Sequence, residues 1–145
     1  MNPILGVDFG KARIGLAISD ELRLLAHPLE TIAAATNAVK QIARMARERN
    51  IDIVVVGIPK KMSGEIGKSA SEVFAFVEKL RATLPCEVLT WDERLTTIAA
   101  QRVLREAGKK TRATRQIVDQ VAAQMILQSY LDRQREAVPA DEISR

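Results

Sequence analysis

Apolar and polar residues alternate with a period of two at the start of the chain, in ILGVDFGKARIGLAISD. This period is typical of strands, and its interruption at Gly10-Lys11-Ala12 predicts two short strands joined by a turn. The next segment, RLLAHPLETI, predicts a third strand, in which Pro28 indicates a sheet edge or a bulge. In the first strand the alternation puts Leu5, Val7 and Phe9 on one face and Ile4, Gly6 and Asp8 on the other.

The remainder of the chain alternates between helical and strand patterns. Apolar residues at helical spacing predict an amphipathic helix over residues 36–48, and the β-branched run IDIVVVGIP is typical of a central parallel strand. Ser69 and Glu72 form a capping box that predicts the start of the helix SEVFAFVEKLRATL. A fifth strand, CEVLTWDE, and two further helices, LTTIAAQRVLREAG and TRQIVDQVAAQMILQSYLDRQ, complete the series.

This order of elements predicts one α/β domain over residues 1–136. Three antiparallel strands come first and helices then alternate with strands, which gives a mixed five-stranded sheet with helices on both faces. The apolar content of 47% is sufficient for the core of such a domain. Residues 137–145 have no apolar periodicity, and we expect a flexible C-terminal tail there.

The charge of the chain favours phosphate-bearing partners. Its net charge is +4, and because aromatic residues make up only 3%, contacts with nucleic acid should go to phosphates rather than to bases. The chain has no apolar run of membrane-spanning length and no charged-then-apolar leader, so we expect a cytoplasmic protein without a membrane partner. One basic segment, GKKTRATR, is either an electrostatic contact or a solvated linker; its basic residues are Lys109, Lys110, Arg112 and Arg115.

Asp8 is the unusual residue of the first strand. A carboxylate in an apolar strand costs several kcal/mol unless it is hydrogen-bonded, paired with a cation or bound to a metal ion. Asp8 is therefore a satisfied structural residue, a turn residue at the strand end, or part of a site. Further carboxylates in comparable positions would favour the last of these interpretations.

Two later segments also carry acids in comparable positions, one at the end of the fifth strand and one on the last helix. Asp92 and Glu93 stand at the end of the fifth strand, where sites form in open α/β sheets, although Asp92 is also explained as a helix N-cap. Asp119 lies on the apolar stripe of the last helix and should point toward the sheet. An arginine partner, Arg13 or Arg94, is an alternative explanation for this buried acid.

Three carboxylates that face inward cannot all stay ionised together unless a cation joins them. Because no histidine lies near them and every donor is an oxygen, Mg²⁺ or Mn²⁺ suits the site better than zinc. Two such ions, roughly 3.5–4 Å apart, would stabilise the attacking and leaving oxygens of a phosphodiester. Asp8 is then a metal ligand on a rigid central strand.

The motifs together resemble the YqgF/RuvX family of pre-16S rRNA nucleases or Holliday junction resolvases, which have a ribonuclease H-like fold. Four segments in order carry the resemblance: GVDFGKARIGLAISD, VVGIPKKMSGEIGKSA, TWDERLTTIAA and IVDQVAAQMILQSYLD. The resemblance implies an acidic, metal-binding catalytic site of Asp8, Glu93 and Asp119. Glu93 is preferred to Asp92 at the middle position because Asp92 already has the capping explanation.

The loop GIPKKMSG departs from the family pattern, since Lys60 and Lys61 replace less charged residues. The nearby GKS resembles part of a Walker A motif, but the glycine that this motif requires is Met62 here, which excludes ATP binding. With Lys68 beside a helix N-terminus, the two lysines are candidates for phosphate contact. Arg13 and Arg94 are further candidates for holding the substrate backbone.

These observations favour a metal-dependent endonuclease that acts on structured nucleic acid. The resemblance implies processing of the 5′ end of pre-16S rRNA during ribosome biogenesis, with pre-rRNA preferred to a four-way DNA junction as the partner. A Holliday junction resolvase and a non-catalytic nucleic-acid-binding module are the alternatives. A resolvase would need a symmetric homodimer to cut two strands, whereas an RNA-processing enzyme could act as a monomer. The least favoured interpretation is that the chain is one half of an actin-like ATPase, because that architecture needs two such domains around the nucleotide and this chain has the length of one.

Overall fold

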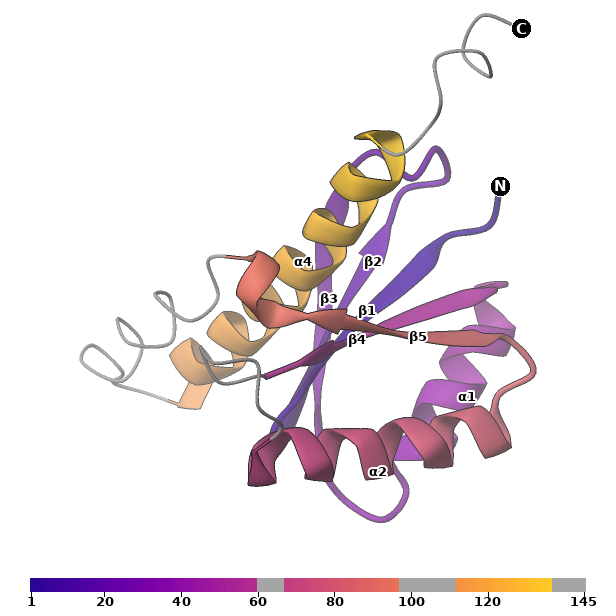
Figure 1. The fold of residues 1–145 in the computed structure, drawn as a ribbon. Helices are drawn as coiled ribbons and strands as arrows, with labels where there is room; N and C mark the ends of the chain where they lie inside the picture. The colour runs from indigo at the N-terminus through magenta and orange to yellow at the C-terminus, as the bar shows by residue number, and fades with distance from the viewer. Residues whose placement is uncertain (60–66, 97–111, 137–145) are drawn as a thin grey trace, which may run out of the picture.

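The computed structural model of the protein describes residues 1–59, 67–96 and 112–136. Figure 1 shows a central sheet with α4 on one side and α1 and α2 on the other. The elements are β1 (Ile4–Phe9), β2 (Arg13–Ser19), β3 (Ala26–Ala33), α1 (Ala38–Glu48), β4 (Ile53–Ile58), α2 (Lys68–Thr83), β5 (Glu87–Asp92), the 3₁₀ helix η1 (Glu93–Leu95) and α4 (Arg112–Glu136).

The predicted mixed five-stranded sheet is confirmed, with the strand order β3-β2-β1-β4-β5. The first three strands are antiparallel neighbours, and β4 and β5 run parallel to β1. The expectation for Pro28 is also met, because β3 is an edge strand and its register with β2 shifts between Leu16 and Ala17. The predicted tail 137–145, and the predicted helix LTTIAAQRVLREAG from residue 97 on, lie outside the described residues.

The alternation predicted for β1 separates two hydrophobic cores. Leu5 and Val7 are completely buried on the face that α1 and α2 cover, where Ile42 and Val77 belong to the same cluster. Ile4 lies on the opposite face in the cluster that includes residues of α4, and Asp8 shares that face. The sheet is therefore covered on both sides, as the β-branched run of β4 predicts.

The capping box predicted at Ser69 and Glu72 is wrong. Helix α2 begins at Lys68, before the predicted cap Ser69, and its N-cap is Gly67, which has no side chain that could cap the helix. Packing decides the phase of this helix, because Ala70 and Val73 are buried in the core. Ser69 is exposed, Glu72 is half-buried, and neither side chain caps the helix.

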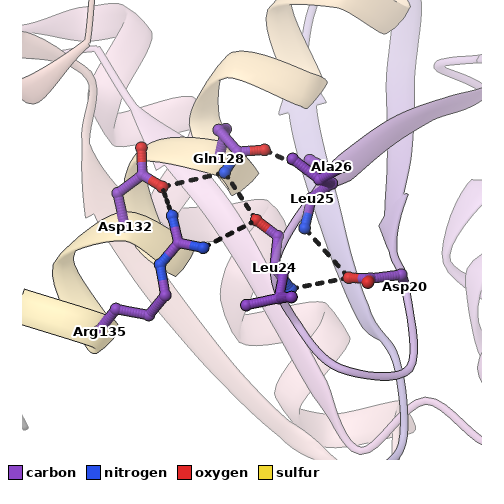
Figure 2. A network of polar contacts seen from close by, with 7 residues as sticks. All are labelled: Asp20, Leu24, Leu25, Ala26, Gln128, Asp132 and Arg135. Carbon is purple, nitrogen blue, oxygen red and sulfur yellow. Dashed lines mark hydrogen bonds and ion pairs between the residues drawn. The ribbon is translucent and has the colours of Figure 1, made fainter.

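Helix α4 is fixed to the sheet by polar contacts at its C-terminal half as well as by its apolar stripe. Figure 2 shows Gln128, which accepts a hydrogen bond from the Ala26 amide at 2.8 Å and donates one to the Leu24 carbonyl at 3.0 Å. Arg135 also donates to this carbonyl and forms an ion pair with Asp132. These contacts set the position of the helix that carries Asp119. In the part of the chain that the structure describes, no helix is long and apolar enough to cross a membrane.

Candidate active site

Asp8 lies near the C-terminal end of β1 with only 5% of its surface exposed. Gly15 on β2 is its direct partner in the antiparallel pair. On the other side, β4 runs parallel with Val7 opposite Val56, so that Gly57 is the next residue beside Asp8. Because both neighbours of Asp8 lack a side chain, the carboxylate lies on a shallow strip of sheet, where other groups can approach it closely.

Glu93 approaches this strip from β5. It is the first residue of η1, is 7% exposed, and follows Trp91, which packs edge-to-face on Tyr130 of α4. Its Oε2 atom lies 3.0 Å from the position that a Cβ atom on Gly57 would occupy. Glu93 therefore reaches over the glycine that flanks Asp8, on the sheet face covered by α4.

Asp92 has the capping role that its position predicts. Its carboxylate accepts a hydrogen bond from the Arg94 amide at 2.9 Å and so caps η1. The Arg94 guanidinium bonds the same carboxylate, with Nη2 2.7 Å from Oδ2, and this hydrogen bond raises the pKa of Arg94. Asp92 and Arg94 therefore form a local pair at the end of β5, and the substrate contact predicted for Arg94 stays a prediction.

Asp119 points inward, as the apolar stripe of its helix predicts, and is 6% exposed. Its Oδ2 atom accepts a hydrogen bond from Nε of Arg13 at 2.6 Å. Of the two arginine partners that the sequence leaves open, the structure shows Arg13. The side chain of Arg13 keeps 32% of its surface exposed, so the pair lies at the edge of the buried region.

A cavity of about 290 Å³ joins Asp8 to the Arg13–Asp119 pair, and Glu93 is not among its lining residues. Asp8 of β1, Arg13 of β2 and Asp119 of α4 line it, and Ser69 and Glu72 from the first turns of α2 complete the lining. The sequence interpretation missed Glu72, which it assigned to a cap. A signal was present: Glu72 and Ser69 have the same helical phase as buried Val73 and Phe76, which places two polar side chains on an otherwise apolar stripe.

The donor chemistry of the site suits a hard divalent cation, since all three buried acids offer carboxylate oxygens. Across residues 1–59, 67–96 and 112–136, however, no three acidic, histidine or cysteine side chains are grouped so as to hold a metal ion. Arg13 occupies one oxygen of Asp119 instead. A shared ion between Asp8, Glu93 and Asp119 therefore stays a prediction.

Most of the predicted basic contacts cannot be placed. Lys60, Lys61, Lys109 and Lys110 lie outside the described residues. Lys68, Arg112 and Arg115 lie within α2 or α4, but their side chains are also outside the described part. Lys11 also lines the cavity; the sequence interpretation placed it in the turn between β1 and β2 but did not name it as a contact.

Curated relatives match the chain over nearly its whole length and carry the name "Putative pre-16S rRNA nuclease". The relative from Chloroflexus aggregans is 48% identical over 134 residues, which cover 91% of this chain and 94% of the relative. The relative from Halalkalibacterium halodurans is 42% identical over 135 residues, with 90% and 96% covered.

Solved structures with the same fold include two proteins in complex with Holliday junctions. RuvC of T. thermophilus, solved in complex with a Holliday junction substrate, has a TM-score of 0.57 at 14% identity, covering 93% of this chain and 96% of RuvC. The Fowlpox virus resolvase, in complex with substrate Holliday junction DNA, has a TM-score of 0.52 at 14% identity, covering 91% and 98%. These similarities confirm the ribonuclease H-like fold that the sequence predicts.

The family model that matches residues 2–133 is RuvX, described as a Holliday junction resolvase. Its span includes all three buried carboxylates, Arg13 and every residue that lines the cavity. Together with the full-length relatives, this match establishes that the chain belongs to the RuvX family.

Proposed function

We propose that this protein is an endonuclease that hydrolyses phosphodiester bonds of structured RNA and processes the 5′ end of pre-16S rRNA in the cytoplasm. The observation that supports the proposal is that three buried acids lie on the α4 side of the sheet. Asp8 and Asp119 line one cavity, and Glu93 reaches over the glycine beside Asp8. Acids buried to this extent are rarely retained without a partner or a chemical role.

In this proposal Asp8, Glu93 and Asp119 hold one or two Mg²⁺ or Mn²⁺ ions. When bound, such an ion supplies Lewis-acid stabilisation of the charge that develops on the phosphate oxygens. The chain contributes a rigid frame, because Asp8 sits on a central strand between two paired neighbours. Arg13 and Lys11 border the same cavity and supply positive charge for a phosphate backbone.

The choice of RNA over a four-way DNA junction rests on the relatives. The proteins named for pre-16S rRNA are 42–48% identical to this chain over about nine-tenths of its length. The resolvases with solved junction complexes are only 14% identical and share the fold alone. An RNA-processing enzyme of this kind can work as a monomer, whereas two coordinated cuts in a junction would need a symmetric homodimer.

Incubation of the pure protein with precursor 16S rRNA and, separately, with a four-way DNA junction tests this proposal. Each substrate is offered with Mg²⁺, with Mn²⁺ or with EDTA. We expect cleavage of the RNA that requires the ion and is abolished by Asp8→Asn, while circular dichroism shows that the variant is folded. Asp52→Asn, which removes an exposed aspartate paired with Arg23, is the matched control and should cleave normally.

Any of three results would overturn the proposal. Undiminished ion-dependent cleavage by Asp8→Asn would remove Asp8 from the reaction. Cleavage of the junction alone, by a protein that sediments as a dimer, would favour the resolvase. Salt-dependent binding of RNA without cleavage, unaffected by loss of Asp8, would instead favour a binding module.

A further inference from the structure

The ion pair between Arg13 and Asp119 joins two segments that lie far apart in the sequence. Arg13 is the first residue of β2, directly after the turn, and Asp119 lies in the N-terminal half of α4. The donor is Nε of the guanidinium and the acceptor is Oδ2, 2.6 Å apart. With an acid side chain only 8% exposed and an arginine 32% exposed, water screens this pair much less than a pair on the open surface.

The pair lies beside Asp8. Gly15 is opposite Asp8, and Arg13, two residues earlier on β2, projects from the same face of the sheet. Gly15 contributes no side chain, and the backbone carbonyl of Asp119 packs directly over it. Nothing from Gly15 therefore separates the guanidinium from the carboxylate of Asp8, and both groups line the same cavity.

A guanidinium in this position supplies part of the positive charge that a divalent cation would supply. It supplies positive charge to a buried carboxylate group that would otherwise repel its acidic neighbours. It also occupies an oxygen of Asp119 that the proposed ion would need.

We propose that Arg13 and the divalent ion compete for Asp119. The inference rests on the proposed function and deepens it. In the ion-free protein Arg13 holds Asp119, and binding of the ion displaces the guanidinium from this carboxylate. The displaced Arg13 stays at the rim of the cavity, where its exposed portion faces the position of a bound phosphate. Arg13 is thus a positioning residue for the acid in one state and a phosphate ligand in the other.

Isothermal titration of the full-length protein with Mn²⁺, without substrate, tests the competition directly. Arg13→Gln removes the competing charge, and we expect it to bind Mn²⁺ about tenfold more tightly than the wild type. The matched control is Arg23→Gln, which breaks the arginine–aspartate pair with Asp52 near the opposite ends of β1 and β4 and should leave the affinity unchanged. Equal or weaker binding by Arg13→Gln would overturn the inference.

A second measurement uses the wild-type protein and does not depend on whether the variant folds. In ¹⁵N-resolved NMR spectra the Nε–H signal of Arg13 should shift when Mg²⁺ is added, because its acceptor changes. The Nε–H group of Arg23, which donates to the Asn2 carbonyl, should not shift. If the backbone amide signals of the cavity residues shift to a plateau as Mg²⁺ is added, the ion binds; if the Arg13 signal does not shift in the same titration, only this inference fails. If neither Mg²⁺ nor Mn²⁺ binds at all, the metal dependence of the proposed function fails with it.

Discussion

Gly15 on β2 and Asp119 on α4 are in backbone contact, because the carbonyl group of Asp119 occupies the space where any larger residue would place its Cβ atom. This contact brings α4 down onto the strand that faces Asp8. The absence of one side chain at position 15 therefore sets the distance between two acids that come from opposite ends of the chain.

Replacement of Gly15 by alanine should consequently be costly. The added methyl group overlaps with helix backbone, which cannot rotate away, so α4 must shift. We expect a loss of about 3 kcal/mol in the free energy of unfolding, measured by urea titration. Gly57→Ala is the matched control for stability, because its methyl group would meet only the ends of two side chains, Ile126 and Glu93, which can move, and should cost less. A Gly15→Ala protein as stable as the wild type would show that α4 is loosely packed.

The two adjacent acids at the end of β5 should respond differently to loss of charge. Glu93→Gln removes a buried carboxylate next to Gly57, and we expect cleavage to fall by at least about 100-fold with the fold retained. Asp92→Asn keeps an oxygen that can still cap η1 and loses only a partly exposed ion pair, so activity should change less than about threefold. Rates under single-turnover conditions check both. The reverse order of effects would make Asp92 the site residue.

The sequence predicts this much of the site because the relevant signals are local. The period of two assigns Asp8 to a face, the helical stripe turns Asp119 inward, and the cap assigns Asp92 a structural role. Each of these three assignments depends only on residues within the same strand or within two turns of the same helix. The same local patterns predict the order of strands and helices. The preference for short connections between consecutive elements then predicts the mixed five-stranded sheet.

The interpretation is incomplete where tertiary contacts decide. No local pattern distinguishes Arg13 from Arg94 as the partner of Asp119, since Arg13 and Asp119 meet across 106 positions. The capping box at Ser69 fails because the buried residues of α2 set the start of the helix at Lys68. Glu72 lines the cavity for the same reason, and its place on the stripe of Val73 and Phe76 is a local signal that the capping interpretation did not use.

Glu72 adds negative charge to a cavity that is proposed to receive phosphates. Glu72→Gln removes that charge at nearly constant size, and we expect RNA binding in EDTA to become about threefold tighter at low salt. Glu78→Gln on the same helix is the matched control, because Glu78 is exposed and pairs with Arg81 away from the cavity. Fluorescence anisotropy at several salt concentrations measures the effect. Weaker binding by Glu72→Gln would instead make Glu72 a direct ligand of the RNA.

Asp20 gives the connection between β2 and β3 a dependence on pH. Its carboxylate accepts hydrogen bonds from the amides of Leu25 at 3.0 Å and Leu24 at 2.7 Å, as Figure 2 shows. The Leu25 hydrogen bond is the main cause that lowers the pKa of Asp20, and the Leu24 hydrogen bond acts in the same direction. A lowered pKa in the folded state means that ionised Asp20 stabilises the protein above its unfolded pKa of about 3.9, and that this contribution is lost as the pH falls through the folded value.

The urea midpoint of the wild type should therefore fall more steeply between about pH 5 and about pH 2 than that of Asp20→Asn, which has no group to titrate at this position. Near neutral pH the wild type has the added stabilisation of the ionised carboxylate, so the midpoints of the two proteins should differ. In acid Asp20 is neutral, as asparagine always is, and because asparagine also keeps an acceptor oxygen the two midpoints should converge. Glu21→Gln, at an exposed acid of the same connection, should follow the wild-type curve. A difference between wild type and Asp20→Asn that stays constant over the whole range would mean that these amide hydrogen bonds do not distinguish the ionised from the neutral side chain.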